Sequence, residues 1–342
     1  MINMRNLDIN YKKNLKMVLK GYQEIVQKIK KVVSRDFKNI NLVGCGANYS
    51  QMLTIKYIFA GLIKNINCNV YQAGEYDRKI PITIDENSLV IGMSHSGNTA
   101  EVYNSLKKSK DQKAKLLAIS SNEESKIAQI ADLHFQYPDG EQMSELKLLF
   151  LSIITFAVAE VMENPLPEEL KEGLFELPEL LEEAHQLYKD GALKFAEDCA
   201  DKDMIYTIGS GPTMGAAFAF GNCKLMEMQW KDASVLNACN FFHGPLEVVD
   251  DNHYFLLFAA GDKQSDYVRR IEEYLEYKKA NYYFVDALDV YSGNSSLVKE
   301  YLTPFLLWPA LTIYAWALEE KTGHNLDIRR NMGKEGTGYI WE

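Results

Sequence analysis

The sequence of 342 residues predicts an α/β fold made of two tandem, doubly wound, flavodoxin-like parallel sheets that are related by an internal duplication. Short apolar segments alternate with segments of helical periodicity, which is typical of a parallel sheet covered on both faces. A small-residue turn, Gly44-Cys45-Gly46, recurs as Gly209-Ser210-Gly211, 165 residues later. A Pro-punctuated acidic stretch near the middle of the chain separates the two halves.

The predicted elements follow in order along the chain. The stretch "NLKMVLKGYQEIVQKIKKVV" spaces its apolar residues three and four apart, which indicates a helix. Five apolar strands are expected after it, namely "NINLVG", "CNVYQA", "SLVIGM", "AKLLAISS" and "DLHFQY". The expected organisation is an N-terminal helix (1–34), a first sheet domain (35–165), an acidic helical linker (166–198), a second sheet domain (199–320) and a C-terminal tail over the active site (321–342).

The duplication makes the differences between the halves informative. At the 165-residue offset, "NVYQAGEY" aligns with "SVLNACNF", and "LVIGM" aligns with "YFLLF". The hydroxyl-rich turn 94–99 aligns with 259–264, which lacks the hydroxyl cluster. Conversely, Glu227 aligns with Leu62 and His243 aligns with Arg78. Each half keeps something that the other lacks, as expected for one site with divided roles.

Composition narrows the class of protein. A net charge of −10 argues against nucleic acid or an anionic membrane as the partner. The longest apolar run, "LTPFLLWPALTIYAWAL", contains proline and favours a buried core helix, and the N-terminus shows no signal peptide. Five scattered cysteines predict reduced thiols and a cytoplasmic location, and neither they nor the six scattered histidines have the spacing of a metal site. No cofactor is expected either.

The turn "SHSGNT" is the candidate phosphate site. It follows a buried strand and opens a helix, with hydroxyls at Ser94, Ser96 and Thr99 and a close backbone approach at Gly97. The N-terminus of a helix offers unpaired N–H groups and partial positive charge to an anion. Ordinary helix capping is the alternative, but it needs one hydroxyl rather than three.

The first glycine turn is a candidate sugar site. After Cys45 and Gly46 come Ala47 and Asn48, so the third glycine of a dinucleotide-binding fingerprint is missing. The turn therefore predicts contact with a sugar through Asn48 and backbone amides, rather than NAD binding.

Glu227 and His243 are candidates for proton transfer. Glu227 lies in the apolar segment "KLMEMQW", and carboxylates in apolar surroundings have raised pKa values that suit proton transfer. His243 precedes Gly244-Pro245, which fixes the backbone at a strand end. A surface glutamate paired with a lysine, and a histidine bonded to a nearby carbonyl, are the alternatives.

The C-terminal tail concentrates Arg329, Arg330 and Lys334 in an otherwise acidic chain. A disordered terminus is one interpretation. Docking of these cations over an anionic substrate is the other.

Together these residues resemble the SIS (sugar isomerase) domain family, over nearly the whole chain. The strings "LMEMQW", "FFHGPLEVVD" and "RRNMGK" are most similar to those of fructosamine-6-phosphate deglycases and of the isomerase half of glucosamine-6-phosphate synthase. The resemblance implies that Ser94, His95, Ser96 and Thr99 hold a 6-phosphate, helped by Cys45–Asn48.

For catalysis, the resemblance implies that Glu227 moves a proton between C1 and C2. His243 would assist ring opening or act as general acid, often across a dimer interface. Lys334 falls where the synthase has its C-terminal active-site lysine. The resemblance also implies a homodimer with sites at the interface and a small phosphosugar substrate.

Departures from the synthase pattern favour a deglycase. Ala47 and Asn48 replace a Thr-Ser pair, His95 replaces a Gln, and no glutaminase domain is evident. We therefore expect cleavage of a 6-phosphorylated fructosamine, such as fructoselysine or glucoselysine 6-phosphate, to hexose 6-phosphate and a free amine. An aldose–ketose or aminosugar-phosphate isomerase and a non-catalytic sugar-phosphate sensor are the alternatives, and the identity of the amine stays open.

Overall fold

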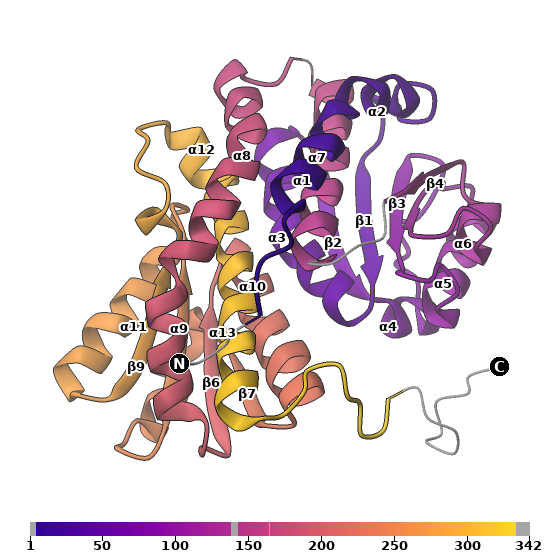
Figure 1. Cartoon of the computed structure of the whole chain (residues 1–342). Coiled ribbons are helices and arrows are strands. Elements are labelled where there is room, and N and C mark those ends of the chain that lie inside the picture. The colour runs from indigo at the N-terminus through magenta and orange to yellow at the C-terminus, as the bar shows by residue number, and fades with distance from the viewer. Residues whose placement is uncertain (1–4, 138–142, 164, 333–342) are drawn as a thin grey trace. The chain divides into compact units, whose positions relative to one another are not determined.

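The computed structural model describes residues 5–137, 143–163 and 165–332. The chain divides into two compact units (Figure 1). Of the described residues, those within 13–171 form the first unit, and residues 172–332 together with residues 5–12 form the second. Each unit contains one parallel sheet, which confirms the predicted fold class.

The sheet of the first unit has the strand order β2-β1-β3-β4-β5. All residues of β1 and β3 are buried, because helices cover both faces of a doubly wound sheet. The strands are β1 (Asn39–Gly44), β2 (Asn67–Gln72), β3 (Ser88–Met93), β4 (Lys115–Ser120) and β5 (Leu133–Gln136).

The N-terminal stretch forms two helices instead of the single helix expected over residues 1–34. The break falls at Gly21, whose N–H donates to Val18 O at 3.2 Å. This is an i→i−3 hydrogen bond of the 3₁₀ type, at the end of the first helix. Glycine is a poor helix former, which explains the interruption. The helices of this part are α1 (Tyr11–Lys20), α2 (Tyr22–Ile29), α3 (Gly46–Leu62), α4 (Ala73–Arg78), α5 (Ala100–Asp111), α6 (Lys126–Ile130) and α7 (Met143–Glu163).

The sheet of the second unit has the order β7-β6-β8-β9. Its strands are β6 (Met204–Gly209), β7 (Asp232–Asn237), β8 (Tyr254–Ala259) and β9 (Asn281–Asp286). α8 (Glu168–Leu187) leads into this unit. The other helical segments are α9 (Lys189–Cys199), η1 (Gly211–Thr213), α10 (Met214–Phe218), η2 (Ala219–Gln229), η3 (Ala238–His243), η4 (Pro245–Val248), α11 (Ser265–Lys278), η5 (Ala287–Asp289), α12 (Ser296–Tyr301), η6 (Thr303–Leu307) and α13 (Trp308–Thr322).

The longest apolar run forms η6 and α13. Residues 308–318 of α13 are all buried, and α9 lies along this helix (Figure 1). The run is therefore a core helix, as predicted. Among the residues that the structure describes, no helix is both long and apolar enough to cross a membrane.

The duplication extends to the pairing register of the strands. Asn39 pairs with Asn67 in the first sheet, and Met204 pairs with Asp232, each 165 residues further on. The pair Ile40–Leu89 likewise recurs as Ile205–Tyr254. The pairing of the fourth strand is displaced by one residue, since Leu89 pairs with Lys115 whereas its counterpart Tyr254 pairs with Asn281, one residue beyond the 165-residue offset.

The segments after the strands follow the same offset. α4 covers residues 73–78 and η3 covers 238–243, while α5 begins at Ala100 and α11 begins at Ser265. Arg78 ends α4, just as its predicted counterpart His243 ends η3. Leu62 ends α3, and its predicted counterpart Glu227 lies close to the end of η2. The residues paired by the offset are thus structural counterparts as well.

Candidate functional site

Two turns of the first unit meet at the carboxyl edge of its sheet. β1 ends at Gly44 and β3 ends at Met93, and these two residues pair with each other. Cys45 and the first residues of α3 (46–48) follow β1 directly, and the turn 94–99 follows β3 directly. The strand order reverses between β1 and β3, the position at which doubly wound sheets bind ligands. The structure therefore brings the predicted sugar and phosphate segments together.

The hydroxyl-rich turn is ordered by its own side chains. Ser94 is buried, and its Oγ lies 2.8 Å from Thr99 Oγ1 and accepts the Gly97 N–H at 3.1 Å. Ser96 Oγ accepts the Asn98 N–H at 3.1 Å. Thr99 precedes α5, but its side chain makes no capping bond to that helix. The first N–H groups of α5 therefore have no partner in the turn and can bind an anion.

Gly97 gives this turn its shape. Its φ is +69°, and a Cβ at this position would lie 2.2 Å from Ser125 Oγ. Ser125 is buried, and its Oγ lies 3.2 Å from Ser120 Oγ. The backbone of the turn thus packs directly on a serine pair that the sequence analysis did not identify, and any larger residue would displace it.

His95 is anchored at the edge of the turn. Its Nδ1 lies 2.7 Å from the hydroxyl of Tyr137, and the two rings stack with centroids 6.0 Å apart. Tyr137 is buried and directly follows β5. Tyr137 was not among the residues predicted from the sequence, although its place after a strand end on the same edge of the sheet was a usable signal.

The turn after β1 contributes an amide. Asn48 Nδ2 donates to Met93 O at 3.4 Å, while its buried Oδ1 has no hydrogen-bond partner among the described residues. Burial raises the pKa of the neighbouring Cys45 thiol, which disfavours the thiolate. Asn48 is therefore the side chain of this turn with an acceptor left for a ligand.

Glu227 lies near the end of η2, which is a π-helix. Such wide turns occur frequently at functional sites. The Glu227 side chain is 30% exposed, and its Oε1 accepts a hydrogen bond from Arg329 Nε at 3.0 Å. Besides its apolar neighbours in sequence, Glu227 therefore has a charged partner, because a cation from 102 residues further along the chain contacts the carboxylate.

The segment after α13 carries that arginine. Gly323, with φ +69°, ends the helix, and the Leu326 N–H donates to Glu319 Oε1 at 3.0 Å. Arg5 forms ion pairs with both Glu319, at 2.6 Å, and Asp327, at 2.9 Å. Buried Leu326 and this ion-pair network hold the segment against the second unit, just before the two arginines.

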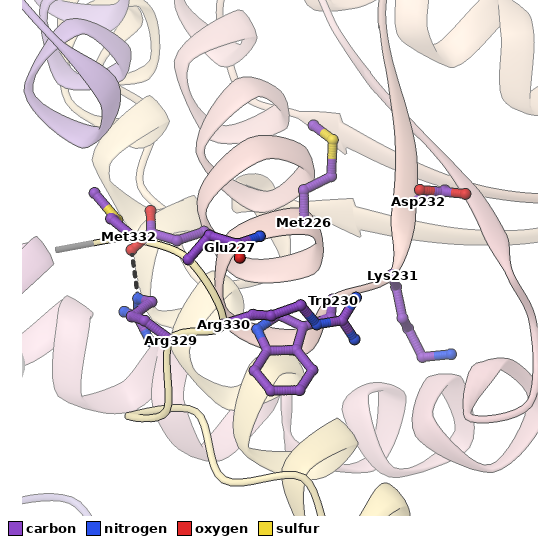
Figure 2. A pocket seen from close by; sticks show the side chains of 9 residues that line it. Met226, Glu227, Trp230, Lys231, Asp232, Arg329, Arg330 and Met332 are labelled. Carbon is purple, nitrogen blue, oxygen red and sulfur yellow. Dashed lines mark hydrogen bonds and ion pairs between the residues drawn. The ribbon is translucent and has the colours of Figure 1, made fainter. Parts of the chain in front are cut away.

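The two arginines have different partners. Arg329 is bound to Glu227, so it is not the free cation that the tail was expected to offer. The guanidinium of Arg330 lies 4.3 Å from the centre of the Trp230 ring. Figure 2 shows both arginines at the pocket that contains Glu227. Lys334, the third predicted cation, lies outside the described residues.

His243 ends η3 and is exposed. Gly244 follows with φ +152°, a conformation that favours glycine, and Pro245 begins η4. In the described part of the chain His243 makes no hydrogen bond to a nearby carbonyl. Gly244-Pro245 is the predicted bend.

Glu227 and His243 lie at opposite edges of the second sheet. Glu227 closely precedes the first residue of β7, Asp232, whereas His243 follows its last residue, Asn237. Six residues of strand separate these two edges, which amounts to roughly 20 Å. His243 accordingly does not line the pocket around Glu227, and the predicted pair does not meet within one chain.

Comparison with known proteins agrees with this architecture. The SIS domain family profile matches residues 35–161. The chain is 31% identical over 316 residues to fructosamine deglycase FrlB of Bacillus subtilis, covering 91% of this chain and 96% of that protein. It is 25% identical over 306 residues to fructoselysine 6-phosphate deglycase of Escherichia coli, covering 89% and 88%.

A solved structure from Bacillus subtilis, described provisionally as a phosphosugar isomerase, superposes with a TM-score of 0.84 at 31% identity. The superposition covers 94% of this chain and 99% of that chain. The likeness thus extends over both repeats. The chain belongs to the SIS domain family, as its motifs predict.

Proposed function

We propose that this chain is an enzyme that processes sugar phosphates, specifically a deglycase for 6-phosphorylated fructosamines. The observation that carries the proposal is the division of roles between the repeats. One repeat has a hydroxyl turn before an uncapped helix, and the other has an accessible carboxylate, Glu227, where its counterpart has Leu62. The relatives named fructosamine deglycase and fructoselysine 6-phosphate deglycase support the same activity.

The turn of the first unit would bind the 6-phosphate. Ser96 and Thr99 would donate hydroxyl hydrogen bonds, and the first N–H groups of α5 would donate from the backbone. Buried Ser94 would hold the Thr99 hydroxyl in place. The open-chain sugar would then extend toward Asn48, whose amide lies beside the end of β3.

Glu227 would perform the proton transfer. The substrate has a carbonyl at C2 and a C1 methylene that carries the amine nitrogen. Glu227 would take a proton from C1 as O2 is protonated, which gives an enaminol, and would return the proton to C2, which gives an imine at C1. Water then adds to the imine and the amine leaves, so the products are an aldose 6-phosphate and a free amine. Arg329 would orient the carboxylate through its 3.0 Å hydrogen bond.

His243 would act in the site of a second copy of the chain. Within its own chain it lies about a strand length from Glu227, and its ring is exposed at the opposite edge of the sheet. A homodimer with sites at the interface would place it near a substrate, where it would assist ring opening or protonate the leaving nitrogen. The symmetry of a dimer would supply two such sites.

The test is product analysis with 6-phosphofructosyl amines. We expect equimolar release of amine and hexose 6-phosphate by the unaltered protein, and loss of about 100-fold to 10,000-fold in kcat for Glu227→Gln, because that change removes a proton acceptor with little change in shape. Glu276→Gln, on an exposed face of α11, serves as the control. Amine release by Glu227→Gln at the unaltered rate would contradict the mechanism.

The same assay separates the alternatives. An isomerase would convert its substrate with the nitrogen retained, and a sensor would bind a sugar phosphate without converting it. Either result would overturn the deglycase proposal.

A further inference from the structure

The pocket beside Glu227 extends away from the carboxylate. It has a volume of about 370 Å³. In Figure 2, Glu227 and Arg329 lie at one end and Lys231 and Asp232 lie at the other, with Met226 and Trp230 between them. The pocket therefore has room for a group attached to the atom on which Glu227 would act.

Of the three cations at this pocket, two are already bound. Arg329 donates to Glu227 at 3.0 Å. Lys231 Nζ donates to two backbone carbonyls, Ala200 O and Lys202 O, both at 2.7 Å. Arg330 lies on Trp230 and has no carboxylate partner in the part of the chain that the structure describes.

The far end of the pocket also carries an anion. Asp232 is exposed at the start of β7 and has no cation partner within residues 5–137, 143–163 and 165–332. Asp232 and Arg330 do not form an ion pair with each other, although both line the pocket. An unpaired cation and an unpaired anion in one pocket are complementary to a ligand that carries both charges.

The backbone around Trp230 fixes one wall of this pocket. Trp230 ends η2 in the left-handed conformation, with φ +57°, which is rare for a bulky residue. Its ring also contacts His324, with ring centres 4.2 Å apart. Strained residues held by their surroundings cluster at ligand-binding sites. The conformation thus holds an aromatic wall between the Glu227 end and the Asp232 end.

We propose that this pocket binds the zwitterionic end of an amino-acid leaving group, with Arg330 binding the α-carboxylate and Asp232 binding the α-ammonium. The inference rests on the proposed deglycase function. A lysine joined to the sugar through its side-chain nitrogen has this form, because its α-amino and α-carboxyl groups stay free. Its methylene chain would pass between Met226 and Trp230.

The test uses four 6-phosphofructosyl amines of equal chain length. The amines are lysine linked through its side chain, 6-aminocaproate without the ammonium, 1,5-diaminopentane without the carboxylate, and pentylamine without either. We expect kcat/KM to be highest for the lysine compound and about tenfold lower for each charge removed, since an exposed charge-assisted hydrogen bond contributes about one factor of ten.

Variants assign each charge to its partner. Arg330→Met should lower kcat/KM about tenfold for the lysine and aminocaproate compounds only. Asp232→Asn should do so for the lysine and diaminopentane compounds only. Arg270→Met is the matched control, because Arg270 is also exposed and lies over an aromatic ring, 4.5 Å from that of Phe242, outside this pocket. It should leave the ratios among the four substrates unchanged.

Failure of the subsite and failure of the proposed function give different results. Equal kcat/KM for all four compounds would keep the deglycase and overturn the subsite. If the unaltered protein releases no amine, the deglycase proposal is contradicted, and calorimetric binding of the four compounds to Glu227→Gln still tests the subsite. An affinity that falls with each charge removed would then support the subsite. Absence of both turnover and charge-dependent binding would overturn the subsite as well.

Discussion

The two repeats solve the same local problem in different ways. α5 and α11 begin at equivalent residues, Ala100 and Ser265, and the first N–H groups of each helix have no partner within the helix itself. Before α11 the protein supplies its own anion. Asp262 is 3% exposed, and its carboxylate accepts hydrogen bonds from the Gln264 N–H at 2.9 Å and the Ser265 hydroxyl at 2.6 Å.

Before α5 the equivalent position is Gly97, and no carboxylate is present in the turn. Three of its side chains, those of Ser94, Ser96 and Thr99, are hydroxyls, which can donate to an anion instead of supplying one. The difference teaches that the second repeat satisfies its helix start with its own side chain, whereas the first leaves its helix start without a side-chain cap, as the proposed phosphate site requires. The second repeat in turn carries Glu227, so the proposed function assigns binding to one repeat and proton transfer to the other.

The largest expected effect tests whether Glu227 of one chain and His243 of a second chain form one active site. Glu227→Gln and His243→Ala should each be inactive as homodimers. When the two variants are co-expressed and the assemblies purified, activity should return to about a quarter of the unaltered level. Half of the dimers would be mixed, and each mixed dimer would have one intact site.

Coupled assay of hexose 6-phosphate measures this recovery. A co-expressed pair of Glu227→Gln and Glu227→Ala is the control and should stay inactive, since no site regains a carboxylate. Absence of recovery in the first pair, with mixed dimers shown by mass, would mean that both residues act within one chain.

A smaller effect is expected in the first repeat. Thr99→Val removes the hydroxyl next to Ser94 with little change in shape, and KM for a 6-phosphorylated substrate should rise about tenfold. The equivalent residue before α11 is Gln264, and Gln264→Ala should leave KM unchanged. Steady-state kinetics measure both, and equal changes in KM for the two variants would contradict the division of roles.

Much of this comparison was accessible from sequence. The strands were predicted because buried parallel strands are short apolar runs, and the 165-residue offset holds to the level of strand pairing. The opposite placement of Glu227 and His243 was also implicit. One precedes β7 and the other follows it, and a strand between two residues puts them at opposite edges of a sheet.

Other features depend on packing that sequence alone does not specify. The contact between Arg329 and Glu227 joins residues 102 positions apart and depends on how the segment after α13 is held by Arg5 and Leu326. The π-helical form of η2 has no separate pattern in its residues. From the sequence, the second repeat was seen only to lack the hydroxyl cluster. The role of Asp262, the counterpart of Gly97, could not be predicted, because the burial of its carboxylate comes from the tertiary fold.

The smallest expected effect tests the internal anion itself. Burial raises the pKa of Asp262, although hydrogen bonds from Ser265 and Gln264 oppose the rise. A carboxyl whose pKa is higher in the folded state contributes most to stability below its unfolded pKa, and that contribution falls as pH rises through the folded value. The free energy of unfolding of the unaltered protein, relative to Asp262→Asn, should therefore be largest in acid and decrease as pH rises through the carboxyl range.

Urea unfolding followed by tryptophan fluorescence measures this difference for the second unit, because all four tryptophans follow residue 172. Asp266→Asn, at an exposed position in the same helix, should show no such decrease. A difference that grows with pH would mean that the charges and N–H groups at the start of α11 stabilise the carboxylate more than burial destabilises it.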